Sequence, residues 1–197
     1  MDEHCDSTEC IDLAGSLGLM ALHWGRIEPG TEEIARFVAH RSSVSLYVYS
    51  GRRPVGNRAL HRPSHRLELN SRPLLLRFLN HVKAIISLHG HGREHDCAYV
   101  GGLNQVMRQR FLQLAREALP QYVWVADLER IPVGLRGVDP DNIVNLPPSQ
   151  GMQLELPRPL RQSGPGLEAG YLEPEGDAVV LSRLLIRFVD TVLDAGN

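Results

Sequence analysis

Two hydrophobic patterns alternate along the chain. Short apolar runs are typical of buried strands, whereas apolar residues spaced three or four positions apart are typical of amphipathic helices. The first pattern predicts strands at Leu17–His23, Val44–Tyr49, Val82–Leu88, Cys97–Val100, Tyr122–Ala126 and Met152–Leu156. The second predicts helices at Thr31–His40, from Ser71 to Leu79, at Leu103–Leu119 and at Ala178–Leu193. This alternation indicates an α/β fold, in which helices cover both faces of a mixed, mostly parallel β-sheet.

The segments between these elements set the expected domain limits and loops. Residues 1–15 are polar, and we expect a leader there before a single domain over residues 16–197. Thr31 is the expected N-cap of its helix, because Glu32 and Glu33 follow in the first turn, where the helix dipole favours acidic side chains. Residues 131–150 are rich in proline, glycine and asparagine, which predicts a long loop, and loops of this length are usually functional.

Composition narrows the class of protein. The chain has 197 residues, of which 43% are hydrophobic, enough for one domain with a substantial core. A net charge of -2, without a basic cluster and interleaved aromatic residues, argues against a nucleic-acid partner. No apolar run approaches the roughly 18 residues of a membrane helix, and the acidic N-terminus lacks the basic start of a secretory signal. We therefore expect no membrane partner and a cytoplasmic protein, with release on cell lysis left open.

The cysteines offer no metal motif. Cys5, Cys10 and Cys97 do not match the spacing of a thiolate zinc site, and their odd number argues against a disulfide framework. We interpret Cys5 and Cys10 as free thiols in a reducing compartment.

Histidine and carboxylate side chains stand at the ends of two predicted strands. His23 ends the first apolar run, Glu28 precedes the next helix, and His89 ends the later run Ala84–Leu88. Because ligands of parallel sheets bind at the carboxyl ends of the strands, these side chains are expected to share one edge. Two imidazoles and one carboxylate can bind a catalytic zinc ion and leave a fourth position for water. The alternative is that each is an ordinary residue at the end of its element.

Two nearby histidines, His91 and His95, lie in a glycine- and histidine-rich loop. They are alternative ligands, a second and weaker metal site, or solvated loop residues.

Glu155 is the candidate general base. It shares one face of the strand Met152–Leu156 with Gln153, and an acidic residue inside an apolar strand is costly unless it is paired or used. A zinc hydrolase needs such a carboxylate beside the metal. The alternative is an exposed face of an edge strand. Arg158 and Arg161 follow this strand and can bind substrate carboxylates bidentately, although arginine is so common in this chain that the assignment is not specific.

Six blocks of sequence then suggest a family. In chain order they read HWGRIEPGTEEIA, ALHRPSH, ISLHGHG, YVGGLN, NIVN and GMQLELPRPLR, and together they resemble the phage-type poly-γ-glutamate hydrolases. The resemblance extends from about Leu19 to Arg161. It implies a zinc peptidase with a carboxypeptidase-like α/β fold that cuts γ-glutamyl linkages. Trp24 and Arg26 stand where the family's first block usually has small residues, so substrate preference stays open.

The resemblance also implies roles for individual residues. It makes His23, Glu28 and His89 the zinc ligands and Glu155 the general acid/base. His61, Ser64 and His65 match the family's His-x-x-Ser block, which implies that they line the cleft and bind substrate; a polar segment at a sheet edge is the alternative.

These observations predict a zinc-dependent hydrolase of amide bonds. The expected substrate is an anionic polymer or peptide, with γ-glutamyl linkages of poly-γ-glutamate preferred. Two alternatives stay open: a zinc amidase or carboxypeptidase acting on other peptides or acylated amino acids, and a non-catalytic binding protein with the same fold.

Overall fold

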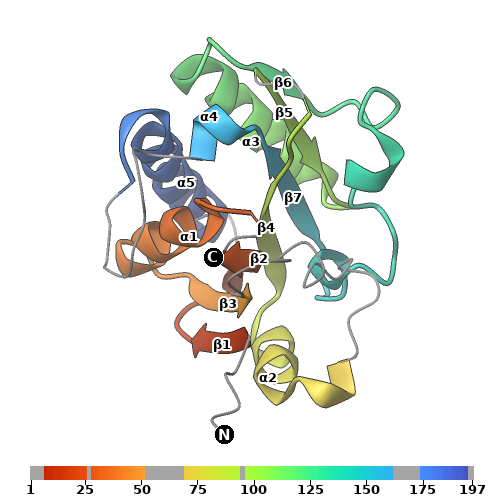
Figure 1. Ribbon diagram of the computed structural model, residues 1–197. Helices are drawn as coiled ribbons and strands as arrows, with labels where there is room; N and C mark the ends of the chain where they lie inside the picture. Colours follow the sequence, from red (N-terminus) through yellow and green to blue (C-terminus); the bar gives the residue numbers. More distant parts are fainter. Residues whose placement is uncertain (1–6, 26–27, 52–68, 94–95, 162–173, 195–197) are drawn as a thin grey trace, which may run out of the picture.

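A mixed sheet forms the centre of the computed structural model, which describes residues 7–25, 28–51, 69–93, 96–161 and 174–194 (Figure 1). Its seven strands lie in the order β1-β3-β2-β4-β7-β5-β6. They are β1 (Ser7–Asp12), β2 (Leu17–Gly25), β3 (Ser45–Gly51), β4 (Ala84–Gly90), β5 (Cys97–Gly101), β6 (Val123–Val125) and β7 (Gly151–Leu156). The pairs β2–β3, β2–β4, β4–β7 and β5–β6 are parallel, whereas β1–β3 and β5–β7 are antiparallel.

Helices cover both faces of this sheet. The helices are α1 (Thr31–His40), α2 (Pro73–His81), α3 (Gln105–Ala118), α4 (Arg158–Arg161) and α5 (Gly176–Asp194), with short 3-10 turns η3 (Leu69–Ser71), η4 (Val133–Leu135) and η5 (Ile143–Asn145). One face packs against α1, α3 and α5, and the other packs against α2 and η5. The predicted fold class, a single α/β domain with a mixed, mostly parallel sheet between helices, is confirmed.

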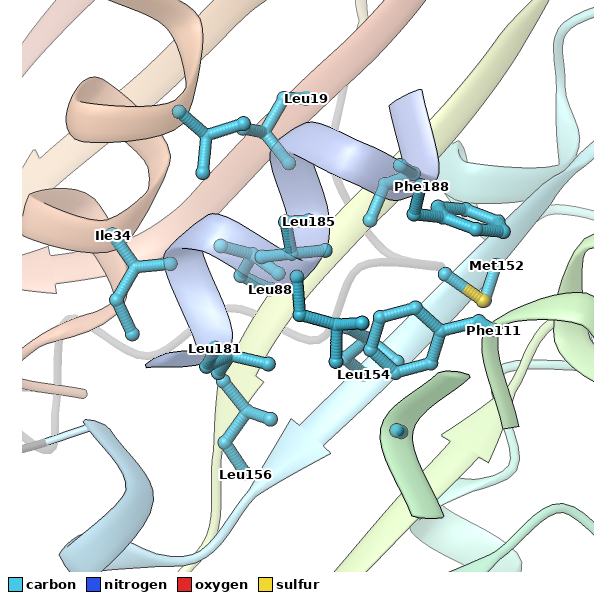
Figure 2. Close-up of a cluster of buried hydrophobic side chains, with 14 of the residues drawn as sticks. Leu19, Ile34, Leu88, Phe111, Met152, Leu154, Leu156, Leu181, Leu185 and Phe188 are labelled. Atoms are coloured by element: carbon cyan, nitrogen blue, oxygen red, sulfur yellow. The ribbon is translucent and has the colours of Figure 1, made fainter. Parts of the chain in front are cut away.

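The larger core lies between the sheet and the three helices α1, α3 and α5 (Figure 2). Leucines of β4 and β7 interdigitate there with α5, and Phe111 meets Phe188 edge to face at a centroid distance of 5.4 Å. Aromatic pairs in this geometry contribute about 0.5–1.5 kcal/mol beyond their buried area. On the other face, Phe78 of α2 packs against Tyr47 and Ile85 in a smaller core. No helix within the described ranges is long and apolar enough to cross a membrane.

The apolar pattern predicted each of these helices except the short α4, and each strand except β1. The predicted polar leader, residues 1–15, contains β1, which pairs antiparallel with β3 at the sheet edge. The predicted N-cap Thr31 is wrong by one residue: Gly30 is the N-cap, at a φ of 96°, and Thr31 is the first helical residue. The Thr31 hydroxyl instead donates to the carbonyl oxygen of Glu28 at 2.9 Å.

Candidate metal centre and active site

The carboxyl ends of β4 and β7 present buried polar side chains on one face of the sheet. The two strands are parallel neighbours, and His89 pairs with Glu155 in their register. Alternate residues of a strand point to opposite faces, and the intervening leucines enter the larger core. The polar set therefore lies on the α2 face, and its members are at most 5% exposed: Ser87, His89, Gln153 and Glu155.

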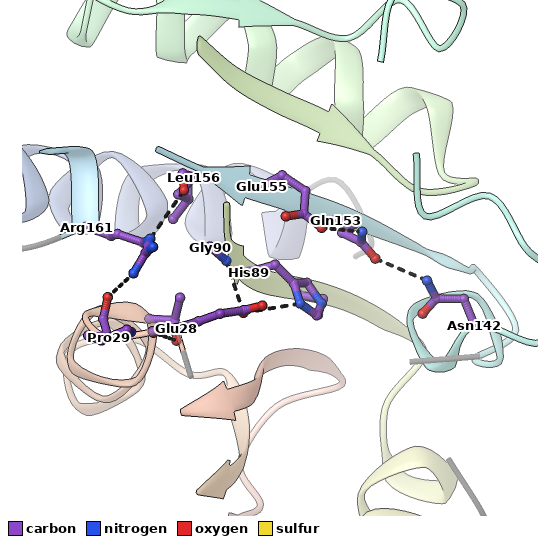
Figure 3. A network of polar contacts seen from close by, with 11 residues as sticks. Glu28, Pro29, His89, Gly90, Asn142, Gln153, Glu155, Leu156 and Arg161 are labelled. Atoms are coloured by element: carbon purple, nitrogen blue, oxygen red, sulfur yellow. Dashed lines mark hydrogen bonds and ion pairs between the residues drawn. The ribbon is translucent and has the colours of Figure 1, made fainter. Parts of the chain in front are cut away.

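Glu28 reaches this face from the turn between β2 and α1 (Figure 3). Its Oε2 lies 3.5 Å from Nδ1 of His89 and accepts the backbone N–H of Gly90 at 3.0 Å. On the other side of the imidazole, Nε2 lies 2.9 Å from the hydroxyl of Ser87. Nδ1 is therefore the nitrogen that faces Glu28.

The spacing of Glu28 and His89 distinguishes two kinds of contact. A charge-assisted hydrogen bond between them would be about 2.7–2.9 Å long, shorter than the 3.5 Å observed. Two ligands that each lie about 2.0–2.1 Å from a tetrahedral zinc ion are roughly 3.4 Å apart. The 3.5 Å spacing is thus compatible with two ligands of one metal ion and is long for a direct charge-assisted hydrogen bond.

Arg161 holds the turn that carries Glu28. Its guanidinium donates to the carbonyl oxygen of Pro29 and, at 3.3 Å, to that of Leu156 at the end of β7. Any side chain at Gly30 would run into the backbone of Arg161, and any at Gly90 into its guanidinium. Arg161 is buried and joins the turn to the sheet; its binding of a substrate carboxylate stays a prediction.

Glu155 is held by a chain of buried amides. Gln153 donates from Nε2 to Oε1 of Glu155 at 2.9 Å, and Asn142 donates from Nδ2 to Oε1 of Gln153 at 3.1 Å. Burial, and next the negative charge of Glu28, raise the pKa of Glu155 well above its ordinary value. The hydrogen bond from Gln153 and the positive charge of Arg161 act in the opposite direction. The alternative position for Glu155, an exposed face of an edge strand, is wrong, because β7 lies between β4 and β5.

His91 is a structural residue. Its Nε2 lies 2.9 Å from the carbonyl oxygen of Cys97, its Nδ1 accepts the N–H of Arg93 at 3.2 Å, and its ring packs on Tyr99. Both ring nitrogens are thus used within the protein, which excludes His91 as a ligand in this arrangement. His95 lies outside the described residues.

Several predicted site residues fall wholly or partly outside the described part of the chain. His61, Ser64 and His65 are outside it, and of His23 only the backbone is described. That backbone lies near the carboxyl end of β2, where the pairing with β3 shifts by one residue between Ala21 and Trp24. Within the described side chains, no three His, Cys, Asp or Glu residues form a metal-binding group.

The remaining candidate, Arg158, is exposed in α4. Its role in binding substrate stays a prediction, as do the roles of His23, Glu28, His89 and Glu155.

Ser87 was not predicted, although the sequence carries a signal for it. A serine two residues before a histidine, inside an apolar strand, shares the face of that histidine. The links from Gln153 to Glu155 and from Asn142 to Gln153 were not predicted either, because only the fold brings Asn142 of the long loop onto β7.

Comparison with known proteins decides the family. A family model described as poly-gamma-glutamate hydrolase matches residues 7–163. The chain belongs to the poly-gamma-glutamate hydrolase family. Membership supports a hydrolase, and the matched range contains the whole candidate site.

Relatives of this poly-gamma-glutamate hydrolase family member include YndL of Bacillus subtilis (strain 168), which is 30% identical over 146 residues. That alignment covers 74% of this chain and 54% of YndL, so the chain spans about half the length of this curated relative. A solved structure described as zinc-free apo YndL matches with a TM-score of 0.84 at 23% identity, covering 97% of this chain and 93% of that chain. A bacteriophage poly-gamma-glutamate hydrolase matches with a TM-score of 0.83 at 22% identity, covering 99% and 93%. These two structures share the fold of this chain.

Proposed function

We propose that this chain is a zinc-dependent hydrolase that cleaves the γ-glutamyl amide bonds of poly-γ-glutamate. Family membership supports the reaction and the substrate class, and the description of one structural relative as zinc-free supports the metal. The observation that carries the proposal is the pair Glu28–His89, spaced 3.5 Å apart next to the buried Glu155.

His23, Glu28 and His89 would hold the zinc ion. Ser87 occupies the Nε2 side of His89, which leaves Nδ1 as the ligand atom and fixes the ring orientation. When bound, zinc in such a site lowers the pKa of water to about 7 and polarises a carbonyl group.

Glu155 would move the proton. Its carboxylate takes a proton from the attacking water and gives it to the leaving nitrogen, as a general base and then a general acid. Burial suits this exchange, because the raised pKa of Glu155 makes its carboxylate a better proton acceptor than an exposed carboxylate.

The substrate would be bound by residues around the metal. His61, Ser64 and His65 are assigned to this role by their match to the family block, and Arg158 by its exposed guanidinium, which can bind a carboxylate bidentately. A polymer with one carboxylate per residue offers such groups at regular spacing.

The test is cleavage of poly-γ-glutamate by the purified chain, followed by viscosity and by product size. We expect a fall in polymer length that stops on chelation and returns on addition of zinc. Poly-α-glutamate and cell-wall peptides serve as matched substrates, and preferential cleavage of either would contradict the γ-glutamyl assignment. Binding of polymer without cleavage, and with no activation by zinc, would contradict the enzyme.

A further inference from the structure

We propose that Asn142 and Gln153 form a directional amide relay that positions Glu155 and leaves Oε2 as the atom that takes the proton. The inference rests on the proposed function, because it concerns the same general base. It assigns positioning roles to two residues and a specific oxygen to the proton transfer.

The direction of the relay begins at a backbone group. The N–H of Val144 donates to Oδ1 of Asn142 at 3.2 Å, at the N-cap of η5. A backbone N–H cannot accept a hydrogen bond, so Asn142 must turn its amide oxygen toward Val144 and its NH₂ group toward Gln153.

The amide orientation of Asn142 sets that of Gln153. Because Asn142 donates to Oε1 of Gln153 at 3.1 Å, the NH₂ group of Gln153 must face Glu155. It donates to Oε1 of Glu155 at 2.9 Å (Figure 3). Oε1 accepts this N–H best when it carries no proton of its own, so the contact favours Oε2 as the protonated oxygen of Glu155.

Burial makes the relay effective. Asn142 is 6% exposed, Gln153 is 4% exposed and Glu155 is 5% exposed, so water competes little for these hydrogen bonds. Within the described part of the chain, Gln153 is the side chain that hydrogen-bonds Glu155. The long loop also closes over the relay at Gly137, where an added Cβ would lie 2.8 Å from the Gln153 amide. The position of Glu155 is thus set by residues of the long loop, through Gln153, rather than by Glu28 and His89.

Asn142→Asp reverses the relay while keeping the cap. A carboxylate still accepts the Val144 N–H, but its second oxygen now faces Oε1 of Gln153. The Gln153 amide must rotate to donate to it, which turns an acceptor toward Glu155. We expect kcat on poly-γ-glutamate to fall about 10²-fold, the effect of misaligning a reacting group, with KM and bound zinc unchanged.

Asn145→Asp is the matched control. Asn145 is equally buried in η5, but its side chain bonds backbone groups rather than Gln153 or Glu155: it donates to the carbonyl oxygens of Gly137 and Asp139 and accepts from Leu103. Placing a carboxylate against two carbonyls lowers stability at least as much as Asn142→Asp, so we expect a lower melting temperature with a wild-type kcat for the folded fraction.

Gln153→Met serves if Asn142→Asp does not fold, because it removes the donor to Glu155 without adding charge. It should lower kcat alone, by a similar factor. A wild-type kcat in a folded Asn142→Asp or Gln153→Met variant would overturn the relay and leave the proposed function intact. An equal fall of kcat in Asn145→Asp would also overturn the relay, because a general loss of structure would then explain both variants. A wild-type chain that cleaves nothing would overturn the proposed function itself.

Discussion

The two faces of β4 and β7 differ although the same strands build both. On one face, Ile86, Leu88 and Leu154 enter a continuous apolar core with α1, α3 and α5 (Figure 2). On the other, the residues between them are polar, and they are equally buried at the carboxyl ends of the strands. Burying a polar group costs free energy unless it is hydrogen-bonded, and each of these side chains has a partner. The first face stabilises the fold through apolar burial. The second face has polar side chains where apolar ones would stabilise more, and their hydrogen bonds hold His89 and Glu155 in place.

On the polar face, we expect the largest loss of activity from a substitution of Glu155. Glu155→Gln keeps the shape and the hydrogen-bonding neighbourhood but cannot accept a proton. We expect kcat to fall about 10²–10⁴-fold, the usual contribution of a general base, with zinc content unchanged. Glu117→Gln, on an exposed position of α3, is the control. Turnover of Glu155→Gln within a few-fold of wild type would remove Glu155 from the reaction.

The apolar face should show the opposite behaviour. Leu154→Ala opens a cavity in the larger core, where Leu154 is 0% exposed, and should lower the free energy of unfolding by about 2–5 kcal/mol. Its kcat should stay near wild type at temperatures where the protein is folded. Denaturant unfolding measures the first quantity, with Leu76→Ala, at a 41% exposed position of α2, as reference. A selective loss of kcat without a loss of stability would contradict the division between faces.

A substitution of Arg161 tests whether the turn between β2 and α1 must be held in place for Glu28 to join the polar face. Arg161→Met removes the link between Pro29 and Leu156, so Glu28 loses its fixed position. We expect zinc affinity to fall about 10–100-fold, as when an outer partner of a metal ligand is lost. Arg158→Met, on the same short helix, should instead raise KM for the anionic polymer and leave zinc affinity unchanged. Competition with a chromogenic chelator distinguishes the two, and equal zinc affinities would refute the role of Arg161.

Ser87 should have the smallest effect. Ser87→Ala removes the partner of Nε2 of His89 without touching the nitrogen that faces Glu28. Zinc affinity should fall by about tenfold, the low end for such outer partners. Ser182→Ala removes another buried hydroxyl, which donates to the carbonyl oxygen of Ala178 in its own helix, and should leave zinc affinity unchanged. A Ser87→Ala variant that binds zinc as tightly as wild type would show that the ring needs no such support.

The sequence predicted most of the fold because its apolar periodicity is strong. The missed strand β1 shows the limit: it is a polar edge strand in which Glu9 and Asp12 interrupt the apolar pattern. Pairing with β3 and contacts that the pattern does not reveal, such as the ion pair of Glu9 with Arg72, stabilise it. The predicted start of α1 differs by one residue because Thr31, which suits an N-cap, follows Gly30. Gly30 takes the cap position with a positive φ and lies so close to the backbone of Arg161 that no side chain fits there, and neither feature can be read from the sequence.

The site was predicted only in part for a related reason. Residues at the ends of parallel strands can be expected to meet, and the structure brings Glu28 and His89 together. The residues of β4 and of β7 do not predict that these two strands are neighbours in the sheet. Arg161 donates to backbone carbonyls, which every residue has, so its partners carry no sequence signature. The shift in β2 between Ala21 and Trp24 likewise interrupts the alternation by which a face is assigned to His23.

The proposed zinc site is tested by zinc content after mild purification, measured by elemental mass spectrometry in wild type, His23→Ala, Glu28→Gln and Glu155→Gln. We expect stoichiometric zinc in the wild type and in Glu155→Gln, and its loss in the other two variants. A wild-type chain that takes up no zinc, or a Glu28→Gln variant that keeps a full complement, would contradict it.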